Sequence, residues 1–480
     1  MSTARGVVAA GHRLTAEAGA DVLRAGGNAF DAAIAALAMA CVSEPILCSP
    51  GGGGFAMIRP GSTQVTSLLD FFAHTPRERG EVTDGVHEVY ADFGTATQRF
   101  HIGPATSATP GFFAGVAAIH AAGATWSLAD CFDAAASTAR AGVEVTPFQH
   151  HLSTVVAPIV TATAGASALF APDGRLLPAG ARLCNPGLAD AFDVMADEGF
   201  AAGPIGAACV GQQSGRGHLT GADLERYEVI ERQPIRVRLG RDIVCLNPAP
   251  AASGRLIAHS LDHLESPDPV DLARALCATD RARRSASGEL AALADVPLRQ
   301  RGTTHVSVID LERNLASVTM SNGEGNGEIV DGFGFMLNNV LGEEDVNHQG
   351  SDWPTDTRLS SMMGPTVIES PDGAVVALGS GGSNRIRSAI LQVVTRLCLG
   401  GESLEDAVSA PRLHVENDHL DFEDLFPGPT RDELVALFPD HLAWPRPDIF
   451  YGGAHSAELG ADGVFHGVGD TRRDGVAVVV

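Results

Sequence analysis

The sequence predicts an α+β globular protein with a strand-rich middle, and three observations support this prediction. Residues 302–310 and 315–322 are rich in Val, Ile and Thr and alternate polar and apolar side chains around a polar turn, which is typical of a β-hairpin. Residues 29–42 form an Ala-rich run that is apolar nearly all round, as in a buried helix. A chain of 480 residues with 45% hydrophobic side chains can also bury a large core.

The remaining elements follow in chain order. A strand at 6–10 precedes a helix at 15–24, which ends at Gly26 and Gly27, and Asn28 then caps the Ala-rich helix. Proline, glycine and capping residues mark the ends of most later elements. We expect strands at 55–58, 65–71, 237–247, 333–339 and 375–378 and around 415 and 420, and helical segments that begin near 109, 128, 186, 219, 251, 268 and 385.

Composition limits the classes of function. The net charge of −25 argues against a surface for nucleic acid or anionic membranes, and no apolar run approaches the ~20 residues of a membrane span. The eight Cys residues lie in apolar segments without zinc-ligand spacing, as expected of buried thiols in a reducing compartment. The first residues show no secretory signal, although a secreted chain trimmed of its signal would begin in the same way. We therefore expect a cytoplasmic protein without a metal site.

The predicted hairpin brings two hydroxyl groups together. A three-residue loop at 311–313 would pair Asp310 with Asn314 and place Thr303 directly opposite Ser321. A slip of one residue would bring the next side chain, an Asn, opposite Thr303 instead. On this stretch alone, an ordinary hairpin with Thr and Ser present for their β-propensity is the simpler interpretation.

The junction between Gly302 and Thr303 also suits a self-cleaving precursor. The Thr303 hydroxyl lies next to the Gly302 carbonyl that it would attack, and cleavage would leave Thr303 with a free α-amine. Such an amine titrates near neutral pH and is held within reach of its own hydroxyl, so it can act as the general base.

The sequence from Thr303, Thr-Thr-His-Val-Ser-Val-Ile-Asp, resembles the start of the small subunit in the γ-glutamyltransferase family of N-terminal-nucleophile hydrolases. Further motifs of that family occur in the same order over almost the whole chain. They lie at residues 12–19, 26–33, 50–55, 219–224, 248–254, 357–362, 379–384, 410–414, 453–457 and 469–475.

The resemblance implies a four-layer αββα sandwich made by two fragments of one cleaved precursor. Residues 1–302 would form the large-subunit part and 303–480 the small-subunit part of one intertwined domain, and the fragments would stay associated, with further dimerisation left open. Thr303 would be the nucleophile of self-cleavage and of catalysis, working through an acyl-Thr303 ester that water or an amine then attacks. No metal or organic cofactor is implied.

The resemblance also assigns the surrounding residues. Ser321 would hold the Thr303 hydroxyl, and the backbone N–H groups of Gly382 and Ser383 would form the oxyanion hole, with Gly381 as the alternative in a second alignment of the glycine turn. The remaining candidates would contact the substrate, and they are Asn322, Glu343, Ser360 and Ser361.

Two positions depart from the family pattern. Phe72 stands where the family has an Arg that binds the substrate α-carboxylate, and Val340 lies near the usual polar contact for the substrate amine. We expect γ-glutamyl groups to be poorly paired here unless Arg358 compensates from the Ser-Ser turn. The variant Phe72→Arg is then expected to recover part of the γ-glutamyl activity.

Three hypotheses follow from the sequence. The first is a γ-glutamyl hydrolase or transferase that acts on glutathione-like compounds. The second is an amidohydrolase or acylase for another small amide, such as an oxamate-type compound, and Phe72 favours it over the first. The third is an unprocessed homologue that binds a ligand without catalysis, and the presence of Gly302, Thr303 and Ser321 argues against it.

Overall fold

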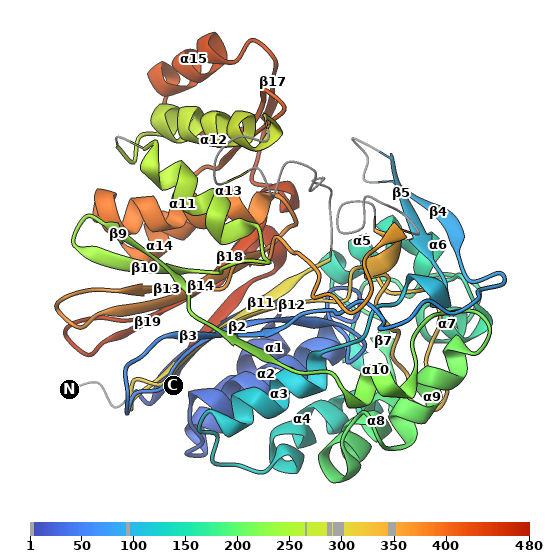
Figure 1. Cartoon of the computed structure of the whole chain (residues 1–480). Coiled ribbons are helices and arrows are strands. Elements are labelled where there is room, and N and C mark those ends of the chain that lie inside the picture. The colour runs from blue at the N-terminus through green and yellow to red at the C-terminus, as the bar shows by residue number, and fades with distance from the viewer. Residues whose placement is uncertain (1–3, 93–96, 265, 286–289, 291–301, 344–351) are drawn as a thin grey trace.

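The computed structural model describes residues 4–92, 97–264, 266–285, 290, 302–343 and 352–480. Two large sheets lie against each other, with helices on the outer side of each (Figure 1). The predicted mixture of helices and sheets is therefore confirmed.

The larger sheet takes its strands from the beginning, the middle and the end of the chain. Its order is β20 (Val476–Val479), β1 (Gly6–Ala10), β11 (Thr304–Asp310), β12 (Leu315–Ser321), β2 (Gly53–Arg59), β3 (Ser67–Phe71) and β8 (Ile230–Arg232). The predicted hairpin, β11 and β12, is thus at the centre of this sheet.

The second large sheet has six strands. Its order is β19 (Phe465–Val468), β18 (Gly453–Leu459), β14 (Val375–Gly381), β13 (Thr366–Glu369), β10 (Asp242–Leu246) and β9 (Ile235–Leu239). Three smaller sheets pair β15 (Leu413–Glu416), β16 (His419–Glu423) and β17 (His441–Trp444), then β4 (His87–Asp92) with β5 (Thr97–Ile102), and β6 (Val143–Glu144) with β7 (Arg182–Leu183). Both large sheets therefore combine strands from either side of the junction between Gly302 and Thr303.

The helices fall into two groups. The first follows the larger sheet and the region beside it: α1 (Arg13–Arg24), α2 (Ala29–Ser43), α3 (Phe112–Ala121), α4 (Leu128–Ala141), α5 (Pro147–Val155), α6 (Ala157–Val160), α7 (Ala164–Phe170), α8 (Pro186–Glu198), α9 (Pro204–Gln213) and α10 (Gly221–Glu225). The second group lies on the side of the six-stranded sheet: α11 (Ser253–Asp262), α12 (Pro269–Arg284), α13 (Arg385–Thr395), α14 (Leu404–Ser409) and α15 (Gly428–Leu437).

Strand alternation explains how the core is divided. Within β11, Val308 packs with α1 and α2 on one side of the sheet, and the next residue, Ile309, packs between the two sheets. The six-stranded sheet buries a separate apolar cluster against α11, α12 and α13. All seven residues of β11 are buried because both faces of the strand are covered.

The hairpin has the predicted register. Thr304 pairs with Met320, which places Thr303 beside Ser321, and the loop at 311–313 has the expected three residues. The Asp310 carboxylate accepts the first backbone N–H of α2, so the loop end of the hairpin is tied to the buried helix. The alternative register, with an Asn opposite Thr303, is excluded.

Two sequence predictions need correction. Residues 333–339 were expected to be a strand, but they make only isolated bridges, including one between Ile329 and Met336, because Gly332 and Gly334 turn the backbone through positive φ. The helices α5, α6 and α7 were not predicted. With nine, four and seven residues, these helices are too short to show a clear helical period in the sequence.

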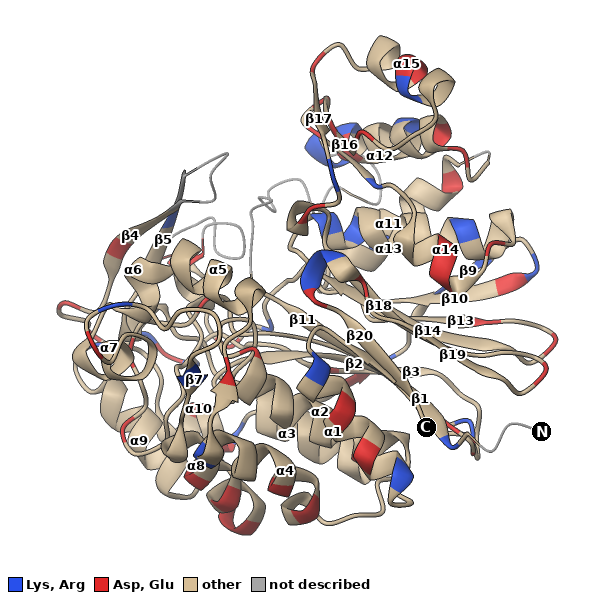
Figure 2. Cartoon of the chain, turned by 180° about the vertical axis from the view of Figure 1, so that it is seen from behind, with Lys and Arg blue, Asp and Glu red and all other residues tan. Residues whose placement is uncertain are grey.

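Charge is unevenly spread over the fold. Acidic side chains are prominent on α4 and α8, and Arg side chains gather on α12 and at the start of α13 (Figure 2). Within the described part of the chain, the helices are too short or too polar to cross a membrane.

Candidate active site

The open end of the central hairpin carries the candidate nucleophile. Thr303 is 3% exposed, and its hydroxyl makes no hydrogen bond to another described residue. The Ser321 hydroxyl instead donates to the Gly302 carbonyl oxygen at 2.6 Å and accepts the Gly323 N–H at 3.0 Å. In the uncut chain, Ser321 therefore polarises the carbonyl that Thr303 would attack, whereas the sequence suggested that it would hold the Thr303 hydroxyl.

Gly302 is held in place by a hydrogen bond from its N–H and by close backbone neighbours. Its N–H donates to Glu324 Oε1 at 3.0 Å. A Cβ atom placed on Gly302 would lie 2.8 Å from the Gly323 carbonyl oxygen and 3.0 Å from that of Ile46. Since both neighbouring atoms belong to the backbone, only glycine fits at position 302 without a shift of the Gly302 carbonyl.

We expect Gly302→Ala to slow self-cleavage about tenfold, because the new methyl group would push the carbonyl away from Ser321 and from the Thr303 hydroxyl. The rate of appearance of the two fragments on a denaturing gel measures this. The matched control is Gly211→Ala in α9, where a Cβ meets nothing within 4 Å. A Gly302→Ala chain that is cut as fast as the control would contradict the expectation.

The glycine turn after β14 lies against the backbone of the nucleophile. A Cβ atom on Gly381 would lie 2.2 Å from the Thr303 carbonyl oxygen, so the end of β14 and the backbone of Thr303 are in close contact. Gly382 and Ser383 follow with φ of +124° and +55°, and α13 then begins. The N–H groups of Gly382 and Ser383 donate to no other described residue, which leaves them free to bind an oxyanion.

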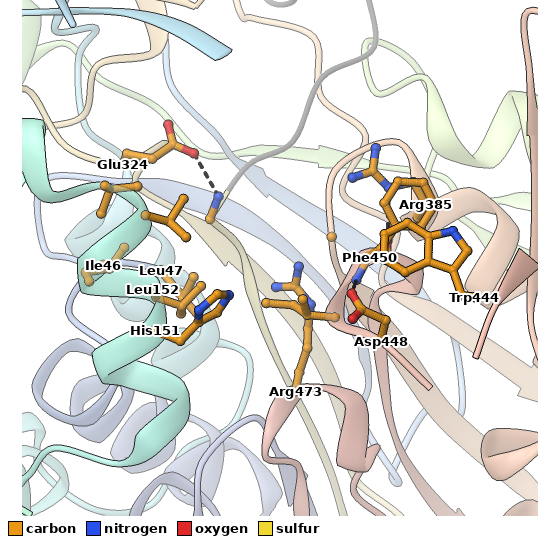
Figure 3. Close-up of a pocket in the computed structure, with 15 residues that line it drawn as sticks. Ile46, Leu47, His151, Leu152, Glu324, Arg385, Trp444, Asp448, Phe450 and Arg473 are labelled. Atoms are coloured by element: carbon orange, nitrogen blue, oxygen red, sulfur yellow. Dashed lines mark hydrogen bonds between the residues drawn. The ribbon is translucent and has the colours of Figure 1, made fainter. Parts of the chain in front are cut away.

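A cavity of about 200 Å³ opens beside Gly302 and Gly382. Figure 3 shows one wall from α5 and the segment after α2, and an opposite wall with aromatic and charged side chains. The lining residues besides the two glycines are Ile46, Leu47, His151, Leu152, Val155, Val156, Glu324, Arg385, Trp444, Asp448, Ile449, Phe450 and Arg473.

Two arginines line this cavity together with the carboxylates Glu324 and Asp448. The Arg473 guanidinium lies beside Gly381 and Gly382, and its Nη1 is 3.5 Å from the Thr303 carbonyl oxygen. Arg385 begins α13, donates from Nε to the Phe450 carbonyl at 3.0 Å and stacks on the Phe450 ring. Burial lowers the pKa of both guanidinium groups to about 10, so both remain charged at neutral pH.

A buried carboxyl group lies below the nucleophile. Glu44 is fully buried, and its two oxygens accept hydrogen bonds from the hydroxyls of Thr304, at 2.6 Å, and Thr15, at 2.8 Å. Burial is the main cause that raises the pKa of Glu44 to about 7, and Asp474 adds to it, whereas the two hydroxyls and Arg473 act in the opposite direction. Glu44 therefore changes protonation near neutral pH, and it does so in contact with Thr304, the residue after the candidate nucleophile.

This shift predicts a pH-dependent stability. Since the folded-state pKa of Glu44 is raised from 4.5 to about 7, ionisation of Glu44 costs folding free energy as pH rises through that window. Between pH 4.5 and 7, we expect the free energy of unfolding of the chain with Glu44 to fall, relative to that of the Glu44→Gln variant, by up to about 3 kcal/mol.

Urea unfolding at several pH values, carried out in an uncut Thr303→Ala background, measures this difference. The exposed Glu405 provides the control, and Glu405→Gln should follow the parent curve over the whole range. If the free energies of unfolding of the parent and of Glu44→Gln changed in parallel with pH, burial would not shift the pKa of Glu44.

Two of the candidate substrate contacts lie close to the hairpin end but not on the cavity wall. Asn322 is 2% exposed, and its Oδ1 has no hydrogen-bond partner among the described residues. Glu343 is buried beside Gly323, where a Cβ atom would lie 2.1 Å from Glu343 Oε1. Their roles as substrate contacts stay predictions.

The two serines of the Ser-Ser turn are engaged within the protein. The Ser360 hydroxyl donates to the Pro250 carbonyl at 2.8 Å, and Ser361 Oγ accepts the Met363 N–H at 3.1 Å. Neither serine is among the described residues that line the cavity. Their contact with substrate also stays a prediction.

The structure revises the interpretation of Phe72 and Arg358. Phe72 is 1% exposed and stacks on Phe55 in the core between the sheets. The terminal nitrogens of Arg358 donate to the Phe72 and Glu228 carbonyls and to the Tyr227 hydroxyl, so this guanidinium is engaged within the protein, and its contact with substrate stays a prediction. The variant Phe72→Arg would bury a charge among apolar rings, and we expect it to destabilise the protein and not to restore γ-glutamyl activity.

Sequence reasoning did not identify Arg385, Arg473 and Glu44 as site residues. Arg473 meets Thr303 across 170 residues of sequence, and Arg385 reaches the cavity only because the glycine turn aims the start of α13 at it. No local sequence pattern identifies them as site residues. A charged residue beside a glycine turn or in an otherwise apolar segment is the one signal that could have indicated a functional site.

Comparisons with known proteins agree with the geometry. A family model described as gamma-glutamyltranspeptidase matches residues 15–279 and 257–480. The acylase ACY 1 proenzyme of Pseudomonas sp. (strain V22) is 28% identical over 530 residues, which cover 99% of this chain and 94% of that protein. The glutathione hydrolase proenzyme of Bacillus subtilis (strain 168) is 26% identical over 553 residues, which cover 98% and 91%.

A solved structure has a similar fold. The crystal structure of cephalosporin acylase from Bacillus halodurans superposes with a TM-score of 0.82 at 22% identity and covers 99% of this chain and 96% of that one. At this identity the likeness concerns the arrangement of the helices and sheets.

Proposed function

This chain belongs to the gamma-glutamyltranspeptidase family of hydrolases and transpeptidases, and we propose that it is a self-processing amide hydrolase or acyl transferase with Thr303 as its nucleophile. One observation carries the proposal: the hydroxyl of Ser321 is bonded to the Gly302 carbonyl at 2.6 Å, next to a Thr303 hydroxyl that no described residue engages. The relatives are themselves named proenzymes, which supports processing.

Self-cleavage would proceed by an N-to-O acyl shift. The Thr303 oxygen forms a bond to the Gly302 carbonyl carbon, the C–N bond of the junction breaks, and the hydroxyl proton ends on the new α-amine. The Ser321 hydroxyl stabilises the developing negative charge on the carbonyl oxygen. Water then hydrolyses the ester and leaves Thr303 as a free N-terminus.

Substrate turnover would repeat this chemistry with the α-amine of Thr303 as general base. The free N–H groups of Gly382 and Ser383 are the candidate oxyanion donors for the substrate carbonyl. An acyl-Thr303 ester forms as the amine of the substrate leaves, and water or an acceptor amine releases the acyl group. The residues named in these steps supply a nucleophile, a base and an oxyanion hole, which is a complete set for acyl transfer.

The apolar surroundings of Phe72 favour an acylase-type substrate over a γ-glutamyl compound. Phe72 and Val340 belong to the same buried cluster between the sheets, together with Leu341, Trp353 and Leu359. The two positions at which the family would bind the α-carboxylate and the amine of a γ-glutamyl group are therefore filled by apolar side chains. A zwitterionic group would lose its hydration there without new partners.

The family relation also supports two structural inferences. The stacked sheets and their covering helices would form the four-layer αββα sandwich of N-terminal-nucleophile hydrolases. Residues 1–302 and 303–480 would remain one folded unit after cleavage, because β1 and β2 flank the hairpin of β11 and β12 in one sheet.

A pair of anilides that differ only by an α-ammonium group tests the substrate class. We expect purified wild-type enzyme to hydrolyse a glutaryl anilide with a kcat/KM at least tenfold above that of the γ-glutamyl anilide, because the apolar side chains of Phe72 and Val340 do not replace the hydration of the ammonium. Release of the aniline measures both rates, and heat-denatured enzyme is the blank. Efficient hydrolysis of glutathione at micromolar concentrations would contradict this prediction and would indicate the γ-glutamyl activity that is usual in the family.

A further inference from the structure

The two arginines of the cavity have hydrogen-bond donors that the protein does not use. Arg385 is 6% exposed, and its single hydrogen bond within the described part of the chain comes from Nε. Arg473 is 7% exposed and has only the 3.5 Å contact from Nη1 to Thr303, and its buried Nε has no acceptor among the described residues. Each of these two buried cations therefore presents unused N–H groups.

The carboxylates around the arginines are engaged elsewhere. Asp448 lines the same cavity, but it accepts the Phe450 N–H at 2.9 Å and forms no ion pair with a described arginine. Asp470 pairs with Arg412 and with Arg472. No described carboxylate lies within ion-pair distance of Arg385 or Arg473, which is unusual for buried guanidinium groups.

We propose that this cavity binds a carboxylate of the substrate between Arg385 and Arg473. The inference rests on the proposed function and makes it narrower, because it selects amides that carry a carboxylate a short distance from the scissile bond. Guanidinium groups with free terminal nitrogens match the geometry of a carboxylate, and a bound anion would supply the partner that the described residues do not provide.

The other wall defines the part of the substrate between the carboxylate and the reacting carbonyl. Ile46, Leu47 and Leu152 are apolar and face the arginines across the cavity (Figure 3). A volume of about 200 Å³ suits a short aliphatic chain or a single ring. The substrate is thus a small amide with an apolar spacer and a terminal carboxylate, on the acyl side or on the amine side of the bond.

Matched amides distinguish the two sides. The acyl pair is a glutaryl anilide and a pentanoyl anilide, and the amine pair is the pentanoyl amide of 4-aminobenzoate and the pentanoyl anilide. We expect wild-type enzyme to prefer the carboxylate in one pair by about ten- to a hundredfold in kcat/KM, as for a hydrogen bond to a charged group. The pair that shows the preference identifies the side of the substrate that enters the cavity.

Variants connect the preference to the cavity. Arg385→Gln should reduce the ratio of kcat/KM between the carboxylate-bearing and the neutral amide of the preferred pair to about threefold or less. The control is Arg387→Gln, since Arg387 is a buried arginine of the same helix that donates to the Val415 carbonyl and does not line the cavity. Its ratio should equal that of wild type even if the stability of the variant falls, because a ratio does not depend on the amount of folded enzyme.

A second measurement does not require any variant to fold. Free glutarate or 4-aminobenzoate should inhibit hydrolysis of the pentanoyl anilide competitively, whereas the corresponding neutral primary amides should inhibit at least tenfold more weakly. Ratios near one in both substrate pairs, together with equal inhibition by acids and amides, would overturn the carboxylate site. An uncut chain that hydrolyses none of the amides would instead overturn the proposed function.

Discussion

Replacing Thr303 by Ala is expected to leave the chain uncut and without amide hydrolase activity. Wild-type protein should yield fragments of 302 and 480 − 302 = 178 residues, and the second should begin with Thr303. The reason is geometric, because the Thr303 oxygen is covalently placed next to the Gly302 carbonyl that Ser321 polarises. Intact-mass measurement of freshly purified and aged protein records the cut.

Two further substitutions separate the hydroxyl of Thr303 from its shape. Thr303→Ser keeps the nucleophilic oxygen and should still be cut, while Thr303→Val keeps the branched shape and should stay intact. A wild-type chain that shows one mass of the full length after prolonged incubation would refute self-cleavage. A Val variant that is cut would show that another group attacks the junction.

Ser321→Ala is expected to slow self-cleavage by about a hundredfold, the cost typical of removing one hydrogen bond to a developing oxyanion. Ser321→Thr retains the hydroxyl and should be cut at a rate near that of wild type. The fraction of cut chain as a function of time measures all three rates.

The matched control is Ser317→Ala on the same strand. The Ser317 hydroxyl is also buried and donates to the Leu378 carbonyl at 2.9 Å, so its loss removes a comparable hydrogen bond away from the junction. Wild-type cleavage in Ser317→Ala with slow cleavage in Ser321→Ala would assign the effect to the Gly302 contact. Equal rates in both variants would mean that the carbonyl needs no donor from Ser321.

The local parts of the fold and site could be predicted from sequence. Alternation and a three-residue loop determine the hairpin register, so the facing of Thr303 and Ser321 follows from counting residues. The Ala-rich helix was predicted at 29–42 and ends at Ser43, because an all-apolar run has to be buried.

Contacts between distant segments could not be predicted in this way. The hydroxyl of Ser321 bonds to the Gly302 carbonyl, a contact outside the paired strands that strand pairing does not specify. Likewise, the meeting of Arg385 and Arg473 depends on how the six-stranded sheet packs on the larger one. Phe72 could be recognised as a departure, but only the structure shows that it fills an apolar cluster with Val340.

Strands from the two sides of the junction between Gly302 and Thr303 alternate within the larger sheet, so a cut there would change how the protein refolds. β11 is hydrogen-bonded to β1 and β12 to β2, and each of these pairs has one strand on either side of the junction. Before the cut, these strands are joined by one chain and find each other as segments of a single molecule. After a cut at this junction, the unfolded enzyme would have to reassemble from two molecules, so its recovery should depend on concentration, while that of the uncut Thr303→Ala chain should not.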